Sequence, residues 1–339
     1  MATSSRARTS RRTFLKFFGG LAVTVAAGGV VWNWMRPGEE ASKPGDHSDS
    51  GRGVRVNPYV EDGKAVVAIV KGEASTDVET MVRRAVDSLG GIGRIVSAGK
   101  RVVVKPSVFT SSPGCAPDPR VVAAVVKLAT EAGGTVVVAE NSGGGDSAYC
   151  MSKLGISSAV QKFGAEVRNL QAEKEVSVKV PKGIALQEVI TFPTIAECDV
   201  LISVPRLKRH GSATVTISLK NMMGIVTKRE MSRFHSTDLS QCIADLNSAL
   251  KPDLTVVDAT SAMTLTGPTG GEMVEMDTIF ASGDPVAVDW ISAQRLQKLE
   301  ASRGTPTFNP ANVRHINAAA ALKVGTNDPD KMMLIEVNL

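Results

Sequence analysis

Basic and imidazole side chains are concentrated in one stretch of the chain, residues 199–235. Two of the four histidines, His210 and His235, lie in it, together with Lys208 and Lys220 beside strand-like apolar runs. Lysine attracts anions, and histidine titrates near neutral pH and can therefore move a proton. We expect a pocket for a small anionic molecule here, with these four residues as catalytic candidates. A solvated basic loop is the alternative.

Further polar residues stand where other apolar runs end. In an open parallel sheet, ligands bind beyond the carboxyl ends of the strands. The glycine-rich loop at residues 267–271 follows the run that ends at Asp258, and such loops can turn N–H groups toward an anion. We expect four residues to bind the substrate: Lys105, Glu140, Asn221 and Gly270.

Metal binding is a second chemistry open to the same region. Imidazole nitrogens and carboxylate oxygens are common ligands of transition metals, and the candidates are His210, His235, Asp258 and Asp289. They lack the H-x-H and H-E-x-x-H spacings. The four cysteines are far apart in sequence, which excludes a ferredoxin-type cysteine cluster. The sequence thus permits a metal ion but specifies no cofactor.

Alternating strand and helix patterns must position these residues. Apolar runs without alternation predict buried parallel strands, and helical patterns with capping residues fall between them. Two short alternating runs predict antiparallel strands at 176–180 and 185–190. The expected fold class is α/β, a mostly parallel sheet with helices on both faces and a smaller antiparallel β insertion or edge. Strands are expected at 65–70, 101–105, 135–139, 200–204, 213–219, 254–258, 278–281 and 333–337, and helices at 77–89, 118–132, 148–163, 239–250, 285–299 and 310–322.

The N-terminus has the pattern of an export signal. Ser10 to Lys16 (SRRTFLK) resembles the twin-arginine motif, and an apolar run from Phe17 to Met35 follows, long enough for a hydrophobic leader helix that spans a membrane. We expect residues 1–35 to be this leader or membrane anchor, 36–60 a flexible linker, and 61–339 an α/β domain. The protein would use the twin-arginine export machinery. It would stay anchored outside the cytoplasmic membrane, or become periplasmic or extracellular if the leader is cleaved.

The charge of the chain belongs to this leader. The formal net charge is +5, but without the six cations of residues 1–38 the remainder has 33 basic and 34 acidic residues. Aromatic residues make up 4% of the chain, too few to suggest a surface that stacks on bases. We therefore expect no nucleic acid as partner.

Cys115 and Cys150 follow two consecutive strands expected to be neighbours in the sheet. Their loops would leave the same edge of the sheet, so the two thiols could form a disulfide in an oxidising compartment. The alternative is that Cys150 faces the core and the two never meet.

Several motifs resemble one family. The chain has Val103-Val104-Lys105-Pro106, Glu140, Val204-Pro205-Arg206-Leu207-Lys208 with His210, Ser218-Leu219-Lys220-Asn221 with Gly224, His235, Asp258, Gly267-Pro268 with Gly270, and Asp284 to Asp289 (DPVAVD). Together they resemble domain-of-unknown-function family 362 over roughly residues 65–325. The family usually has Asn after Lys-Pro, where this chain has Ser107. The resemblance implies a fold and a shared polar site but no reaction.

Two classes of function remain open. One is an enzyme that acts on a small anionic substrate, with or without the assistance of a metal ion. The other is a protein that binds or delivers a metal or cofactor without turnover. The sequence specifies neither substrate nor oligomeric state.

Overall fold

The structure is a computed structural model that describes residues 25–26, 29–30 and 55–339. The chain divides into two units, Met1–Lys43 and Pro44–Leu339. In the first unit, β1 (Val25–Ala26) pairs antiparallel with β2 (Gly29–Val30), so these four residues are not part of the leader helix that the sequence predicted. The remainder of the predicted leader, with the twin-arginine motif, lies outside the described residues. No helix in the described part of the chain combines the length and hydropathy needed to span a bilayer.

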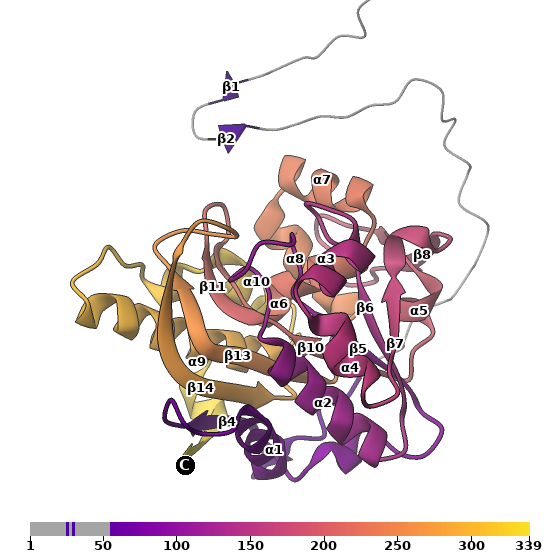
Figure 1. Ribbon diagram of the computed structural model, residues 1–339. Coiled ribbons are helices and arrows are strands. Elements are labelled where there is room, and N and C mark those ends of the chain that lie inside the picture. Colours follow the sequence, from indigo (N-terminus) through magenta and orange to yellow (C-terminus); the bar gives the residue numbers. More distant parts are fainter. Residues whose placement is uncertain (1–24, 27–28, 31–54) are drawn as a thin grey trace, which may run out of the picture. The chain divides into compact units, whose positions relative to one another are not determined.

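The second unit is built on an 11-stranded mixed sheet whose main order is β15-β4-β14-β13-β10-β5-β6-β7 (Figure 1). All pairs along this order are parallel except those that β14 makes with β4 and β13. The strands are β3 (Val60–Glu61), β4 (Lys64–Lys71), β5 (Arg101–Pro106), β6 (Thr135–Glu140), β7 (Glu166–Asn169), β10 (Val200–Val204), β11 (Arg206–His210), β12 (Thr214–Thr216), β13 (Leu254–Thr264), β14 (Glu272–Ser282) and β15 (Met332–Asn338).

Helices cover both faces of this sheet. Alternate residues of β5 point to opposite faces: Val102 and Val104 contribute to one core, and Val103 contributes to the other. Helices α1, α2 and α4 pack in the first core, whereas α8, α9 and α10 pack in the second (Figure 1). The helices are α1 (Val78–Ser88), α2 (Pro119–Glu131), α3 (Ser147–Lys153), α4 (Ile156–Gln161), α5 (Pro193–Ala196), α6 (Ser218–Asn221), α7 (Lys228–Ser236), α8 (Leu239–Ala249), α9 (Pro285–Ser302) and α10 (Arg314–Ala321).

The predicted class, a mostly parallel α/β sheet, is confirmed. The two short alternating runs form β8 (Val176–Lys179) and β9 (Glu188–Thr191), an antiparallel pair in a sheet of their own. The helix predicted at 148–163 is instead two helices, because Gly155 adopts a φ of +78° between them. The strand predicted at 213–219 ends at Thr216, since Ser218 already begins α6.

The stretch after Pro205 also differs from the prediction. The basic segment after Pro205, for which the sequence predicted no strand, is the strand β11, which pairs antiparallel with β12 and parallel with β13. Its leading residues are buried, and Lys208 is 1% exposed. The alternative of a solvated basic loop is therefore wrong for Arg206 and Lys208, which point into the protein, whereas Lys228 and Arg229 farther along the basic stretch are exposed.

Candidate functional site

The parallel strands β5, β6 and β10 end at the same edge of the sheet, and the chain continues there from β10 into β11. Lys105 stands at the end of β5 beside Ser203 of β10, and Glu140 is the last residue of β6. Three of the four predicted catalytic residues reach this region from β11 and α6: Lys208, His210 and Lys220. The sheet topology thus explains why residues more than a hundred positions apart meet.

A buried ion pair forms the first part of the site. Lys105 Nζ lies 2.8 Å from Glu140 Oε2, and the two side chains are 2% and 1% exposed. The same ammonium donates to Asn221 Oδ1 at 2.6 Å and to Pro106 O at 2.8 Å. Burial lowers the pKa of Lys105 and raises the pKa of Glu140, and their mutual attraction opposes both shifts.

The chain around this pair leaves little room beside it. Glu140 also accepts hydrogen bonds from the backbone N–H groups of Val108, at 2.7 Å, and Asn141, at 2.9 Å. A Cβ atom at Gly224 would lie 2.1 Å from Glu140 Oε1 and 2.5 Å from Lys105 Nζ, so only glycine fits there. Of the residues expected to bind substrate, Lys105 is thus hydrogen-bonded to both Glu140 and Asn221.

Asp289 holds the segment that carries Lys220. Its carboxylate, fully buried on α9, accepts hydrogen bonds from Ser218 N at 2.8 Å and Leu219 N at 3.0 Å. These are the first N–H groups of α6, which have no partner within the helix. Burial raises the pKa of Asp289 well above its ordinary value. Asp289, predicted as a metal ligand, therefore fixes α6 and through it Lys220.

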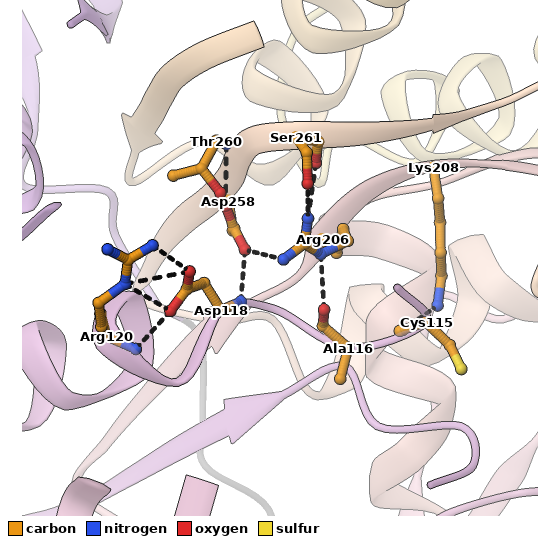
Figure 2. Close-up of polar contacts among 9 residues, drawn as sticks. All are labelled: Cys115, Ala116, Asp118, Arg120, Arg206, Lys208, Asp258, Thr260 and Ser261. Carbon is orange, nitrogen blue, oxygen red and sulfur yellow. Dashed lines mark hydrogen bonds and ion pairs between the residues drawn. The ribbon is translucent and has the colours of Figure 1, made fainter. Parts of the chain in front are cut away.

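Asp258 holds a second network, drawn in Figure 2. Arg206 Nη2 lies 2.9 Å from Asp258 Oδ2, and the backbone N–H of Asp118 donates to the same oxygen at 2.6 Å. Arg206 Nε also donates to Ala116 O at 2.6 Å, and Figure 2 shows the guanidinium between Asp258, Ala116 and Ser261. The network ties the loop before α2 to β11 and β13.

Lys208 makes another contact with that loop. Its ammonium donates to Cys115 O at 2.6 Å, and Figure 2 shows the side chain extended toward this carbonyl. Burial is the main cause that lowers the pKa of Lys208 to about 8, and the charges of Lys105 and Arg206 add to it. Among the described residues, the amine therefore has a carbonyl partner and no carboxylate in direct contact.

Lys220 has still fewer partners. Its only hydrogen-bond contact within the described residues is with Met223 Sδ, at 3.4 Å. The side chain is partly buried, and its desolvation, followed by the charges of Lys208 and Lys105, lowers the pKa of its amine to about 7. No acidic group contributes to that pKa among the described residues. The positive charges of the three lysines therefore repel one another. The carboxylate of Glu140 already forms an ion pair with Lys105.

Two of the predicted imidazoles interact electrostatically with Lys220. His210 is partly buried, and burial with the nearby lysines lowers its pKa to about 2. Its Nδ1 accepts the N–H groups of Ser212 and Ala213 at 3.1 Å each, so the neutral ring carries its proton on Nε2. His235, exposed on α7, has its pKa lowered by desolvation and by Lys220. Both rings are therefore neutral near pH 7.

A third imidazole, His315 on α10, was given no role from the sequence. It is fully buried, and neither ring nitrogen has a hydrogen-bond partner among the residues that the structure describes. Burial and the charge of Lys220 lower its pKa to about 3, and His315 also acts on the pKa of His210. A lone histidine in a helix gave no signal. The charge of Lys220 acts on this buried ring, so His315 belongs to the electrostatic surroundings of the predicted site residues.

The residues predicted as metal ligands are not gathered in the structure. Within residues 55–339 no three histidine, cysteine or acidic side chains lie close enough together to hold a metal ion. Asp258 and Asp289 accept the hydrogen bonds described above. Gly270, predicted to bind substrate, is exposed in the turn between β13 and β14, with open space around its Cβ position.

The two cysteines considered for a disulfide are both free and buried. Cys115 Sγ donates to Ser112 O at 3.2 Å and contacts Thr110 Oγ1 at the same distance. Burial raises the pKa of the Cys150 thiol. Cys150 faces the core of the α1, α2 and α4 side, as in the alternative reading.

Comparison with known proteins agrees with the resemblance seen in the sequence. Residues 102–294 match the family described as "Domain of unknown function (DUF362)". The chain belongs to this family. All predicted site residues lie inside the matched range, and His315 lies beyond it.

Two further similarities are found. The chain is 27% identical over 225 residues to the "Thylakoid-associated protein sll1697" of Synechocystis sp. strain PCC 6803, which covers 64% of this chain and 69% of that protein. The lactate racemase apoprotein from Thermoanaerobacterium thermosaccharolyticum is similar with a TM-score of 0.46 and 11% identity. That match covers 72% of this chain and 59% of the racemase chain.

Proposed function

We propose that the protein is an extracytoplasmic enzyme that acts on a small anionic substrate at the lysine and histidine site. The observation that carries the proposal is the charge balance around Lys220. Its amine is desolvated beside Lys105 and Lys208, and no acidic group among the described residues supports its charge. An anion bound between these amines offsets their repulsion, which makes binding of a negatively charged group favourable.

The same groups supply acid–base chemistry. An amine with a pKa of about 7 is part neutral and part protonated at physiological pH, which suits a general base or acid. Lys208 binds the anionic group of the substrate, and Lys220 takes or gives the proton. The Nε2–H group of His210 is a hydrogen-bond donor for a developing negative charge. His235, at the exposed side, is the second candidate for proton transfer.

The location outside the cytoplasm rests on the N-terminal sequence. Export by the twin-arginine route is supported by the motif at Ser10 to Lys16 and by the apolar run after it. If this apolar run is not cleaved, it retains the protein at the membrane. The cyanobacterial relative is described as thylakoid-associated. A fusion of residues 1–60 to a folded reporter tests this. Export that is lost when Arg11 and Arg12 are both replaced by Lys supports the route, and unchanged export refutes it.

The catalytic proposal is tested with the full-length protein. Small carboxylates, phosphate esters and sulfate esters are screened for an increase in melting temperature, and stabilising compounds are then tested for turnover. Lys220→Ala and His235→Ala should fold and lose activity, whereas Lys64→Ala, which removes an exposed lysine, should keep it. Unchanged turnover in both site variants would refute the assignment.

Metal analysis and an absorption spectrum of the same preparation separate this proposal from the alternative of a metal or cofactor carrier. Stoichiometric metal that is lost in His210→Ala and His235→Ala, with no turnover of any stabilising anion, would favour the carrier. Turnover that survives a chelator would favour the acid–base enzyme.

A further inference from the structure

The three lysine amines of the site differ in what they contact. Lys105 donates to three oxygen atoms and Lys208 donates to the carbonyl of Cys115. Lys220 contacts no oxygen acceptor among the described residues, only the thioether of Met223. An ammonium with strong acceptors is held in its charged form, whereas an amine without them is available as a nucleophile.

The backbone that carries Lys220 is firmly held. Asp289 fixes the first two residues of α6, and Asn221, the next residue after Lys220, is anchored to Lys105 and to Ser203. Lys220 therefore stands between two buried anchors, while its own side chain is left without a hydrogen-bonded oxygen. Such an arrangement positions a reactive group rather than using its charge for stability.

We propose that Lys220 forms an imine with a small oxo acid, an inference that rests on the proposed anion site and names its substrate class. The carboxylate of the oxo acid is attracted by Lys208, and the carbonyl carbon is attacked by the Lys220 amine. This class of compound has a negative charge and an electrophilic carbon in one small molecule. It therefore uses both the cationic neighbours and the unpartnered amine.

The reaction is balanced by the groups named. The nitrogen lone pair forms a C–N bond, the carbonyl π pair moves to oxygen, and a proton passes from nitrogen to that oxygen to give a carbinolamine. The nitrogen lone pair then forms the C=N bond while the C–O bond breaks, and the oxygen leaves as water after taking the second nitrogen proton. The protons pass from the nitrogen to the oxygen, and the Nε2–H group of His210 is the hydrogen-bond donor for that oxygen as negative charge develops on it.

The neighbouring charges support this chemistry. With a pKa of about 7, roughly half of the Lys220 amines are neutral at pH 7. An exposed lysine at the ordinary value of about 10.4 is neutral in only about one molecule in several thousand. The neutral fractions alone therefore favour reaction at Lys220 by about a thousandfold over a surface lysine.

Reductive trapping tests the inference. The full-length protein is incubated with pyruvate or glyoxylate and sodium cyanoborohydride, which reduces an imine to a stable secondary amine, and the modified lysines are located by peptide mass spectrometry. We expect the carboxyalkyl adduct at Lys220, formed far faster at pH 7 than any adduct at the exposed Lys71. The initial rate at Lys220 should reach half its maximum near pH 7.

Lys220→Arg is the matched control, because it keeps a positive charge and cannot form an imine. It should still be stabilised by pyruvate and should show no adduct at position 220. Stabilisation of the wild type by pyruvate without trapping at Lys220, or trapping no faster than at Lys71, would overturn the imine and leave the anion site standing. Absence of both stabilisation by the whole set of anions and trapping would overturn the anion site as well.

Discussion

The buried ion pair between Lys105 and Glu140 supports the site, and breaking this pair tests that support most directly. The two charges lie 2.8 Å apart and are almost fully excluded from water. Lys105→Met leaves the Glu140 carboxylate with the N–H groups of Val108 and Asn141 as its hydrogen-bond donors within residues 55–339. Glu140→Gln leaves the Lys105 ammonium with neutral oxygens of Pro106 and Asn221.

Each single variant thus keeps one buried charge without its opposite. The loss of one partner of a buried pair costs about 3–5 kcal/mol of the free energy of unfolding. The double variant Lys105→Met/Glu140→Gln contains neither charge, so its cost should not exceed that of one single variant, about 3–5 kcal/mol. Simple addition of the two single effects predicts about 6–10 kcal/mol, and the coupling energy should therefore be at least about 3 kcal/mol.

The assay is urea unfolding of the full-length protein at pH 7.5, monitored by circular dichroism. The free energies of unfolding of the variants are compared with a common m value, the slope of free energy against urea concentration. The control cycle uses Arg83→Met and Glu131→Gln, since this pair has the same 2.8 Å separation but both side chains are exposed. The coupling there should stay below about 1 kcal/mol. A buried cycle that is additive, or single variants no more costly than the exposed controls, would refute this account of the site.

Three further perturbations test other parts of the site. Asp258→Asn removes the charge that Arg206 contacts and should lower the free energy of unfolding by about 3–5 kcal/mol in urea. Glu336→Gln, at an exposed ion pair, should leave the unfolding midpoint close to that of the wild type. Equal midpoints for the two variants would contradict the network. Gly224→Ala should lower the melting temperature because its Cβ meets Glu140 and Lys105, while Gly93→Ala, with open space, should not; equal melting temperatures would refute the close packing. Lys220→Met should be more stable than wild type at pH 6 by urea unfolding. That advantage should shrink from pH 7 to 10, because the folded wild type binds fewer protons than the unfolded chain in this range; a pH-independent difference would refute the lowered pKa.

The sequence predicted the parallel sheet well because its signal is local. Buried apolar runs such as residues 101–105 and 200–204 mark strands without reference to distant residues. The signals for helix starts are equally local. Asp118 and Asp284 are the N-cap residues of α2 and α9, and each is followed by proline at the first helical position. The edge that gathers Lys105, Glu140 and Lys208 then follows from the rule for parallel strands.

β11 could not be recognised in the same way, because its partners are distant in sequence. Arg206 and Lys208 are charged residues in a strand, a pattern that ordinarily indicates a solvated loop. Their charges are buried because the carbonyls of Cys115 and Ala116 and the carboxylate of Asp258 accept their hydrogen bonds. The carbonyls of Ala116 and Cys115 lie some ninety positions before Arg206 and Lys208 in the sequence. The spacing of residues within 206–210 therefore does not indicate these contacts.

His315 was missed for a related reason. It lies on α10, whose residues show the ordinary pattern of a helix packed on one face, and a single histidine there is most often a buried core residue. Only the fold brings its ring near His210 and Lys220.

The carboxylates that the sequence suggested for ligand binding are hydrogen-bonded to other parts of the protein. Glu140 is engaged by Lys105, Asp258 by Arg206 and the N–H of Asp118, and Asp289 by the first N–H groups of α6. Each of these acids therefore supports the backbone or another side chain, and none is directed to Lys220 or Lys208. Because the acids are used in this way, the groups left to meet a ligand are amines and neutral imidazoles. A ligand that complements the protonated amines carries a negative charge, which supports the proposal of an anionic substrate at this edge of the sheet.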